Sequence, residues 1–281
     1  MNKIIATPSN TKEILETYDL YAKKNYGQNF LVESQIVDKI AKHAVLSENS
    51  VVIEIGPGIG ALTQFLANYA KQVIAFEIDE RLIPVLKNTL SDKDNVEIIQ
   101  EDFLNIDLDE IVKTYSEVVV AANLPYYITT PILFKIFESN ANIKQITVMM
   151  QKEVADRFSA KVNSKDYNAL SIIAQYHYDI KTIMKISKHV FNPKPNVDSA
   201  VVQFTYRPNT LVDDEKAFFL MVKACFKQRR KTILNNYGEY LNDKEKARQY
   251  LQSANIDIKS RAESLTREAF VRLYEVEKNG S

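Results

Sequence analysis

The chain alternates between short apolar runs and amphipathic stretches over its first two thirds. The apolar runs are rich in β-branched residues and are bounded by glycine or polar residues, which is typical of buried strands. The stretches between them repeat apolar positions at helical spacing. The predicted strands cover residues 51–55, 73–76, 96–99, 118–122, 146–150, 180–186 and 199–205. The predicted helices cover residues 35–42, 61–66, 81–90, 132–137 and 169–176.

This order of elements predicts the domain organisation. Strands that alternate with helices indicate right-handed crossovers and a mostly parallel sheet. The pattern changes at residues 206–209, a predicted linker, and only helical patterns follow from Asp213 onward. We therefore predict a doubly wound α/β domain over residues 1–207, including a polar segment 1–33, and a small all-helical domain over residues 208–281. Ser34 is the predicted N-cap of the first helix of the sheet domain.

Composition narrows the class of protein. The chain has 281 residues, of which 46% are hydrophobic and 26% charged, as in ordinary globular proteins. A single cysteine, Cys225, excludes an intrachain disulfide, and three histidines leave little for a metal centre, so no metal is expected. The apolar runs are too short to span a bilayer, and residues 1–8 do not resemble a signal peptide. We expect a cytoplasmic protein that makes no membrane contact.

A glycine-rich loop and two acidic residues mark a candidate ligand site. Gly56, Gly58 and Gly60 follow a predicted strand and open a helix, where a ligand can approach the backbone closely. Glu77 ends the next strand and is placed to accept hydrogen bonds from both ribose hydroxyls. Asp102 follows the third strand and is suited to accept from an adenine amino group. These residues predict an adenosine-containing ligand, without choosing between a nicotinamide dinucleotide and S-adenosylmethionine.

The tetrapeptide Asn-Leu-Pro-Tyr at residues 123–126 adds a specific chemistry. The 6-amino nitrogen of adenine is a poor nucleophile because its lone pair is delocalised into the ring. The amide oxygen of Asn123 and a neighbouring main-chain carbonyl can each accept one of its N–H groups, which favours a pyramidal nitrogen. Pro125 stiffens the corner, since its φ is fixed, and Tyr126 can stack on an extruded base. An activated methyl donor then needs positioning and electrostatics rather than a nucleophilic side chain.

Five ordered motifs carry a family resemblance. They are residues 24–31 (KNYGQNFL), 54–60 (EIGPGIG), 77–79 (EID), 123–128 (NLPYYI) and 191–199 (FNPKPNVDS). Over about residues 20–275 the chain resembles the ribosomal RNA adenine N6-dimethyltransferases, and most closely the bacterial 16S rRNA branch linked to kasugamycin sensitivity. The resemblance implies a Rossmann-like class I methyltransferase sheet with a helical C-terminal domain. It also implies transfer of four methyl groups to two adjacent adenosines near the 3′ end of 16S rRNA, within an immature 30S subunit.

The resemblance also implies residue roles. The methyl donor would be S-adenosylmethionine, with S-adenosylhomocysteine as product, and the partner would be 16S rRNA bound by a monomer. The implied catalytic residues are Asn123, Leu124, Pro125 and Tyr126, with Tyr126 and Phe191 stacking on the target base. The implied donor-binding residues are Gln28, Asn29, Leu31, Gly56, Gly58, Gly60, Glu77, Ile78, Asp102 and Asn123.

A basic cluster opens the helical domain, where this family contacts RNA. It consists of Lys223, Lys227, Arg229, Arg230 and Lys231. The whole chain has a formal net charge of 0 and a pI of about 6.9, so any contact with nucleic acid must come from a local patch. We predict that this basic cluster binds RNA; a solvated helix face is the alternative.

Three other functions remain open. The 23S rRNA dimethylases of the macrolide-resistance type share these motifs, although residues 123–131 and 191–199 favour the 16S branch. The chain could also act mainly as a factor in ribosome assembly that sits on the immature subunit. A nicotinamide-dependent oxidoreductase is disfavoured, because the glycine spacing is unusual for one and no histidine or lysine is placed for hydride chemistry.

Overall fold

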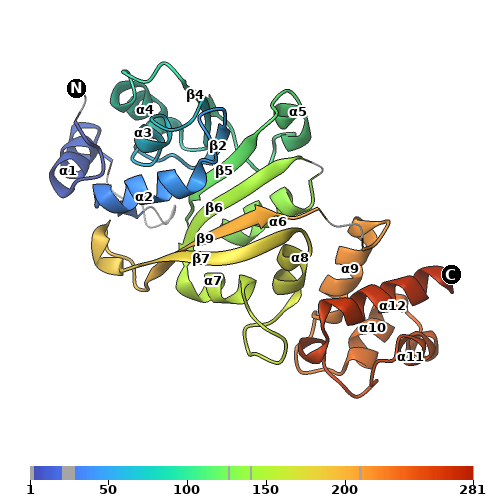
Figure 1. Cartoon of the computed structure of the whole chain (residues 1–281). Coiled ribbons are helices and arrows are strands. Elements are labelled where there is room, and N and C mark those ends of the chain that lie inside the picture. The colour runs from blue at the N-terminus through green and yellow to red at the C-terminus, as the bar shows by residue number, and fades with distance from the viewer. Residues whose placement is uncertain (1–2, 21–28, 126, 140, 209–210, 281) are drawn as a thin grey trace. The chain divides into compact units, whose positions relative to one another are not determined.

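A seven-stranded sheet forms the first part of the molecule (Figure 1). The computed structural model describes residues 3–20, 29–125, 127–139, 141–208 and 211–280. The strand order is β4-β3-β2-β5-β6-β9-β7. The strands are β2 (Val51–Ile55), β3 (Gln72–Glu77), β4 (Val96–Gln100), β5 (Val118–Asn123), β6 (Ile143–Gln151), β7 (Tyr178–Ile186) and β9 (Ser199–Tyr206). Strands β2 to β6 are parallel and β9 is antiparallel to β6, which confirms the predicted α/β class and the mostly parallel sheet.

The central strands are buried along their whole length. Every residue of β2 is buried, and the β-branched side chains that predicted this strand fill both faces of the sheet. Ile55 lies opposite Phe76 of β3 and Ala122 of β5, so the three strands end at one level. The chain runs outward from β2 in one direction and from β5 in the other. Ligands of open α/β sheets bind beside such a switch point, at the carboxyl ends of the strands.

Within the described residues the helices are α1 (Pro8–Thr17), α2 (Ser34–Ala44), α3 (Thr63–Leu66), α4 (Ile83–Thr89), α5 (Leu108–Val112), α6 (Thr129–Phe137), α7 (Lys152–Phe158), α8 (Ala169–His177), α9 (Glu215–Cys225), α10 (Ile233–Leu241), α11 (Lys244–Ser253) and α12 (Arg267–Asn279). Helices α2 to α8 lie between strands along the chain, α1 precedes the first strand, and α9 to α12 follow the last one. Ser34 is the first residue of α2 and Glu33 its N-cap, so the predicted cap was wrong by one residue. No helix in the described ranges is long and apolar enough to cross a lipid bilayer.

A short second sheet joins two distant parts of the sequence. Strand β1 (Phe30–Leu31) pairs antiparallel with β8 (Phe191–Asn192), and Leu31 lies opposite Phe191. Both Leu31 and Phe191 are buried, in a core that also contains Val52 of β2. This pairing brings the first and last of the five sequence motifs together.

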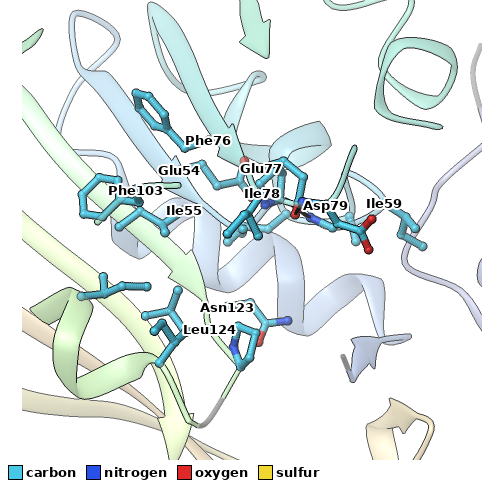
Figure 2. A pocket seen from close by; sticks show the side chains of 18 of the residues that line it. Glu54, Ile55, Ile59, Phe76, Glu77, Ile78, Asp79, Phe103, Asn123 and Leu124 are labelled. Carbon is cyan, nitrogen blue, oxygen red and sulfur yellow. Dashed lines mark hydrogen bonds between the residues drawn. The ribbon is translucent and has the colours of Figure 1, made fainter. Parts of the chain in front are cut away.

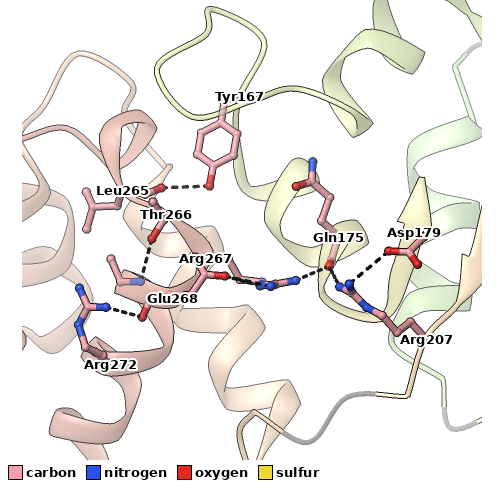
Figure 3. Close-up of polar contacts among 10 residues, drawn as sticks. Tyr167, Gln175, Asp179, Arg207, Leu265, Thr266, Arg267, Glu268 and Arg272 are labelled. Carbon is pink, nitrogen blue, oxygen red and sulfur yellow. Dashed lines mark hydrogen bonds and ion pairs between the residues drawn. The ribbon is translucent and has the colours of Figure 1, made fainter. Parts of the chain in front are cut away.

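The chain divides into two compact units, Met1–Ala155 with Lys181–Tyr206, and Asp156–Ile180 with Arg207–Ser281. Polar contacts explain why residues 156–180 group with the C-terminal helices (Figure 3). The Tyr167 hydroxyl donates to the carbonyl of Leu265 at 3.0 Å. Arg267 and Arg207 both donate to the carbonyl of Gln175, at 2.9 and 3.5 Å. The functional division after residue 207 stays a prediction.

Candidate active site

A cavity of about 300 Å³ opens at the carboxyl ends of the parallel strands. Loops that follow β2, β3, β4 and β5 line it (Figure 2). Residues of β1 and β8 also line it. The predicted site residues that line it are Asn29, Leu31, Gly56, Gly58, Glu77, Ile78, Asp102, Asn123, Leu124, Pro125 and Phe191. Gln28 and Tyr126 lie outside the described residues. Residues that were far apart in the sequence are thus brought to one cavity.

The glycine loop after β2 needs the backbone freedom of glycine. Gly56 and Gly58 have φ values of +67° and +62°, which residues other than glycine rarely adopt. A Cβ at Gly56 would meet nothing within 4 Å, whereas one at Gly58 would contact the Phe30 ring at 3.5 Å. Gly60 differs, because it does not line the cavity and a Cβ there would come within 3.2 Å of Leu90. The structure therefore places Gly60 where the loop packs against α4.

Glu77 ties two loops of the site together. Its carboxylate accepts hydrogen bonds from the backbone N–H of Gly58 at 3.1 Å and from that of Asp79 at 2.9 Å. The side chain is 5% exposed. Burial raises the pKa of Glu77, while these backbone N–H groups act in the opposite direction. Each carboxylate oxygen can accept a further hydrogen bond from a ligand.

Glu54 lies at the floor of the cavity and was not predicted as a site residue. It is 1% exposed, and its Oε2 has no hydrogen-bond partner among the described residues. Burial raises the pKa of Glu54 to about 8; the nearby Thr63 hydroxyl opposes that shift and the charge of Glu77 adds to it. Burial therefore favours the neutral, protonated form of the Glu54 carboxyl group. Its position one residue before the end of the apolar strand β2 was the sequence signal, since a carboxylate is rare there.

Asp102 begins a tight turn after β4. Its Oδ1 accepts from the Leu104 N–H at 2.9 Å, and its carbonyl accepts from the Asn105 N–H at 2.8 Å. The next side chain, Phe103, is buried and packs edge-on against Phe76 with ring centroids 5.9 Å apart. Phe103 also lines the cavity and was likewise missed by the sequence analysis. The turn thus presents one carboxylate and one apolar ring to the cavity wall.

The corner after β5 is built from Asn123, Leu124 and Pro125. The Pro125 carbonyl accepts from the Ile128 N–H and from the Thr129 hydroxyl, each at 3.2 Å, which anchors the corner to the start of α6. The Asn123 side chain lines the cavity and has no hydrogen-bond partner in the described parts of the chain. An amide in that state is available to a ligand.

The comparison with known families decides the identity of this site. The family model described as "Ribosomal RNA adenine dimethylase" matches residues 20–278. The chain belongs to the ribosomal RNA adenine dimethylase family. It is 51% identical to "Ribosomal RNA small subunit methyltransferase A" of Bacillus pumilus over 98% of each chain. It is 50% identical to the protein of the same name from Staphylococcus epidermidis, over 99% of this chain and 98% of that one.

Solved structures of similar proteins agree with the fold of the dimethylase. A dimethyladenosine transferase from Plasmodium falciparum superposes with a TM-score of 0.74 at 26% identity, covering 88% of this chain and 97% of that one. The 23S rRNA methyltransferase ErmE superposes with a TM-score of 0.66 at 27% identity, covering 88% and 98%. The predicted Rossmann-like methyltransferase fold, with helices in the C-terminal part, is confirmed.

The basic cluster of the dimethylase lies in the second unit and is largely ion-paired. Lys227 and Lys231 both contact Glu239, at 2.7 and 3.4 Å, and Arg229 contacts Glu263 at 2.9 Å. The hydrogen bonds from Lys227 and Lys231 lower the pKa of the Glu239 carboxyl group. Arg230 is exposed and makes no ion pair with any described residue. These ion pairs were not predicted from the sequence, because they join residues 8 to 34 positions apart and leave no local pattern.

The described residues form no candidate metal site. Within the ranges that the structure describes, no group of three or more histidine, cysteine, aspartate or glutamate residues is placed to hold a metal ion. The thiol of Cys225 is buried. Burial raises the pKa of that thiol, which makes it an unreactive core residue.

Proposed function

We propose that this chain transfers methyl groups from S-adenosylmethionine to the 6-amino nitrogens of two adjacent adenosines near the 3′ end of 16S rRNA. The observation that carries the proposal is the unpartnered Asn123 amide, which lines the same cavity as the glycine loop and Glu77. The small-subunit substrate is supported by relatives of that name at about 50% identity, against 27% for the 23S enzyme ErmE.

The cavity fits the methyl donor. Gly56 and Gly58 leave room for a ligand beside the backbone, and Glu77 offers two carboxylate oxygens for the hydroxyls of a ribose. Asp102 would accept from the adenine amino group, and Ile78 would contact the ring. Gln28, Asn29 and Leu31 would contact the methyl donor from the N-terminal segment. When bound, S-adenosylmethionine supplies an electrophilic methyl group next to a positively charged sulfur, and S-adenosylhomocysteine is the product.

The protein's own part in the reaction is to hold the target amine. The Asn123 amide oxygen and the Leu124 carbonyl would each accept one N–H of the adenine amino group, which directs its lone pair toward the methyl carbon. Anchoring of the Pro125 carbonyl by α6 supports a fixed corner, so little reorganisation is needed as charge develops. Tyr126 and Phe191 would sandwich the target base.

The wider setting of the reaction is also a proposal. The basic cluster, Lys223, Lys227, Arg229, Arg230 and Lys231, would contact rRNA phosphates; Lys227, Arg229 and Arg230 are exposed, and Lys223 and Lys231 are half-buried. The substrate would be an immature 30S subunit in the cytoplasm, bound by one copy of the chain, with a role in the biogenesis of that subunit.

Methylation of two defined substrates tests the proposal. Immature 30S particles from cells that lack this chain and protein-free 23S rRNA are each incubated with the protein and labelled donor. Mass spectrometry of nuclease fragments should then reveal dimethyladenosine at two adjacent positions of the 16S rRNA only. Methylation of 23S rRNA alone would overturn the choice of substrate.

A further inference from the structure

A lysine from α6 reaches the loop that follows β4. The Lys135 ammonium donates to the carbonyl oxygens of Leu104 at 2.9 Å and of Ile106 at 2.7 Å. Lys135 is half-buried, does not line the cavity, and has no carboxylate partner within the described part of the chain. Hydrogen bonds from a charged donor are about twice as strong as neutral ones, so two of them constrain the path of this loop.

The constrained loop carries Asp102. The Leu104 N–H donates to the Asp102 carboxylate, and the Leu104 carbonyl accepts from Lys135. These two groups belong to adjacent peptide units, so a shift of the Leu104 carbonyl would rotate the N–H that holds Asp102. The Asp102 carboxylate is therefore two hydrogen bonds away from the ammonium of Lys135.

Helix α6 links this loop to the other side of the cavity. Its first residue, Thr129, donates through its hydroxyl to the Pro125 carbonyl of the Asn123 corner. Ile132, one helical turn before Lys135, is buried and lines the cavity. One short helix thus contacts the corner proposed to hold the target amine and the loop proposed to hold the adenine of the donor.

We propose that Lys135 is a positioning residue, which aims the Asp102 carboxylate at the 6-amino group of the donor's adenine by clamping the carbonyls of Leu104 and Ile106. This inference rests on the adenine-binding role proposed above for Asp102. Lys135 acts through the loop and touches neither substrate. Its effect falls on how well the site recognises the amino group of the adenine.

The test measures recognition of that amino group directly. Calorimetry gives the Kd of S-adenosylhomocysteine and of its analogue in which hydrogen replaces the 6-amino group. In the unsubstituted protein the amino compound should bind about 10- to 100-fold more tightly, the value of one hydrogen bond to a charged acceptor. In Lys135→Met this ratio should fall at least about threefold, and Lys135→Arg should restore part of it. A purely structural loss would weaken both ligands equally and leave the ratio unchanged.

Matched variants separate the possible failures. Lys113→Met removes a lysine that contacts Glu110 on α5 and should leave the ratio unchanged. Asp102→Ala should bring it close to one. A ratio near one in the unsubstituted protein would overturn the role of Asp102 and this inference with it. A normal ratio that survives in Lys135→Met would overturn the inference about Lys135 alone. If Lys135→Met does not fold, Lys135→Gln is judged by the same criterion.

Discussion

The cavity of the first unit and the basic cluster of the second are built on opposite principles. In the cavity, Glu77 is 5% exposed and is held by backbone N–H groups of two loops. In the basic cluster, exposed side chains pair with exposed side chains, as Lys227 does with Glu239. A buried contact with the backbone has one geometry, whereas an exposed ion pair exchanges readily with water, salt or a phosphate.

This difference sets the size of the effects that substitutions should have. Buried polar groups in a site of low dielectric lose much when one partner is removed, because the other partner stays unsatisfied. Exposed cations contribute small, salt-dependent increments that sum over several contacts. The cavity should thus respond steeply to single substitutions, and the basic cluster should respond weakly to each one.

The largest effect is expected at Asn123. Asn123→Ala removes an acceptor proposed to act on the target amine, so methyl transfer should fall about 100- to 1000-fold. Binding of the immature 30S particle, which we propose depends on the exposed charges of the basic cluster, should change less than about twofold. Single-turnover methylation and filter binding measure the two quantities.

An asparagine outside the cavity provides the control for this experiment. Asn88 lies on α4, is exposed and does not line the cavity, so Asn88→Ala should leave both quantities unchanged. A folded Asn123→Ala protein that no longer binds the particle would show that transfer and binding share one site rather than lying in two regions.

The fold could be predicted from the sequence wherever local pattern decided the structure. The runs at 51–55 and 118–122 are confirmed as β2 and β5, because β-branched residues buried on both faces leave a clear signal. Helix α1 begins at Pro8 with Thr7 as a side-chain N-cap, within a polar and mixed segment whose sequence carries only a weak helical signal. The grouping of residues 156–180 with the C-terminal helices depends on long-range bonds such as Tyr167 to Leu265, which no local pattern contains.

The residues of the site also fall into two groups, those that the sequence pattern predicts and those that it does not. Parallel strands place their carboxyl ends at one edge, so Glu77, Asp102 and Asn123 could be brought together from the sequence alone, and all three line the cavity. Glu54 was missed because it sits inside an apolar strand and was interpreted as part of that strand. Lys135 was missed because its partners are backbone carbonyls, which carry no residue-specific signal.

The second-largest effect is expected from the buried carboxyl group of Glu54. Burial raises the pKa of Glu54 to about 8, well above its usual range. The unfolded chain releases this proton near pH 4.5 and the folded chain near pH 8, so folding stability should be lost as the pH rises through this window. Glu54→Gln lacks this proton, and the difference in unfolding free energy between pH 5 and pH 8 should shrink by about 3 kcal/mol.

Urea unfolding at the two pH values measures this change. Glu97→Gln, on the exposed side of β4, is the matched control and should retain the pH dependence of the unsubstituted protein. Equal pH dependence in Glu54→Gln and the unsubstituted protein would show that burial of Glu54 does not control the pH dependence of stability.

A smaller effect is expected for donor binding at Glu77. Glu77→Gln removes the negative charge and turns an amide N–H₂ toward a backbone donor, so the Kd for S-adenosylhomocysteine should rise about 10- to 100-fold. Glu101 also lines the cavity but is exposed, and Glu101→Gln should change the Kd less than about threefold. Calorimetry compares the two variants, and similar effects would remove the distinction between buried and exposed carboxylates in this site.

The smallest effects are expected in the basic cluster, where they depend on pairing. Arg230 has no ion pair among the described residues, so Arg230→Gln should weaken rRNA binding about three- to fivefold at 0.1 M salt and reduce the salt slope by about one. Lys227 already contacts Glu239, and that carboxylate neutralises part of the charge that a phosphate would otherwise meet. Lys227→Gln should therefore cost less than about twofold.

Glu239→Gln should change rRNA binding by the basic cluster in the opposite direction. It releases Lys227 and Lys231 together, so rRNA binding should tighten about two- to threefold and the salt slope should steepen. Competition by non-cognate RNA should rise in parallel, since free cations do not read sequence. If rRNA binding is unchanged in Arg230→Gln and in Glu239→Gln and does not depend on salt, the basic cluster is a solvated face. Other surfaces would then contact the rRNA.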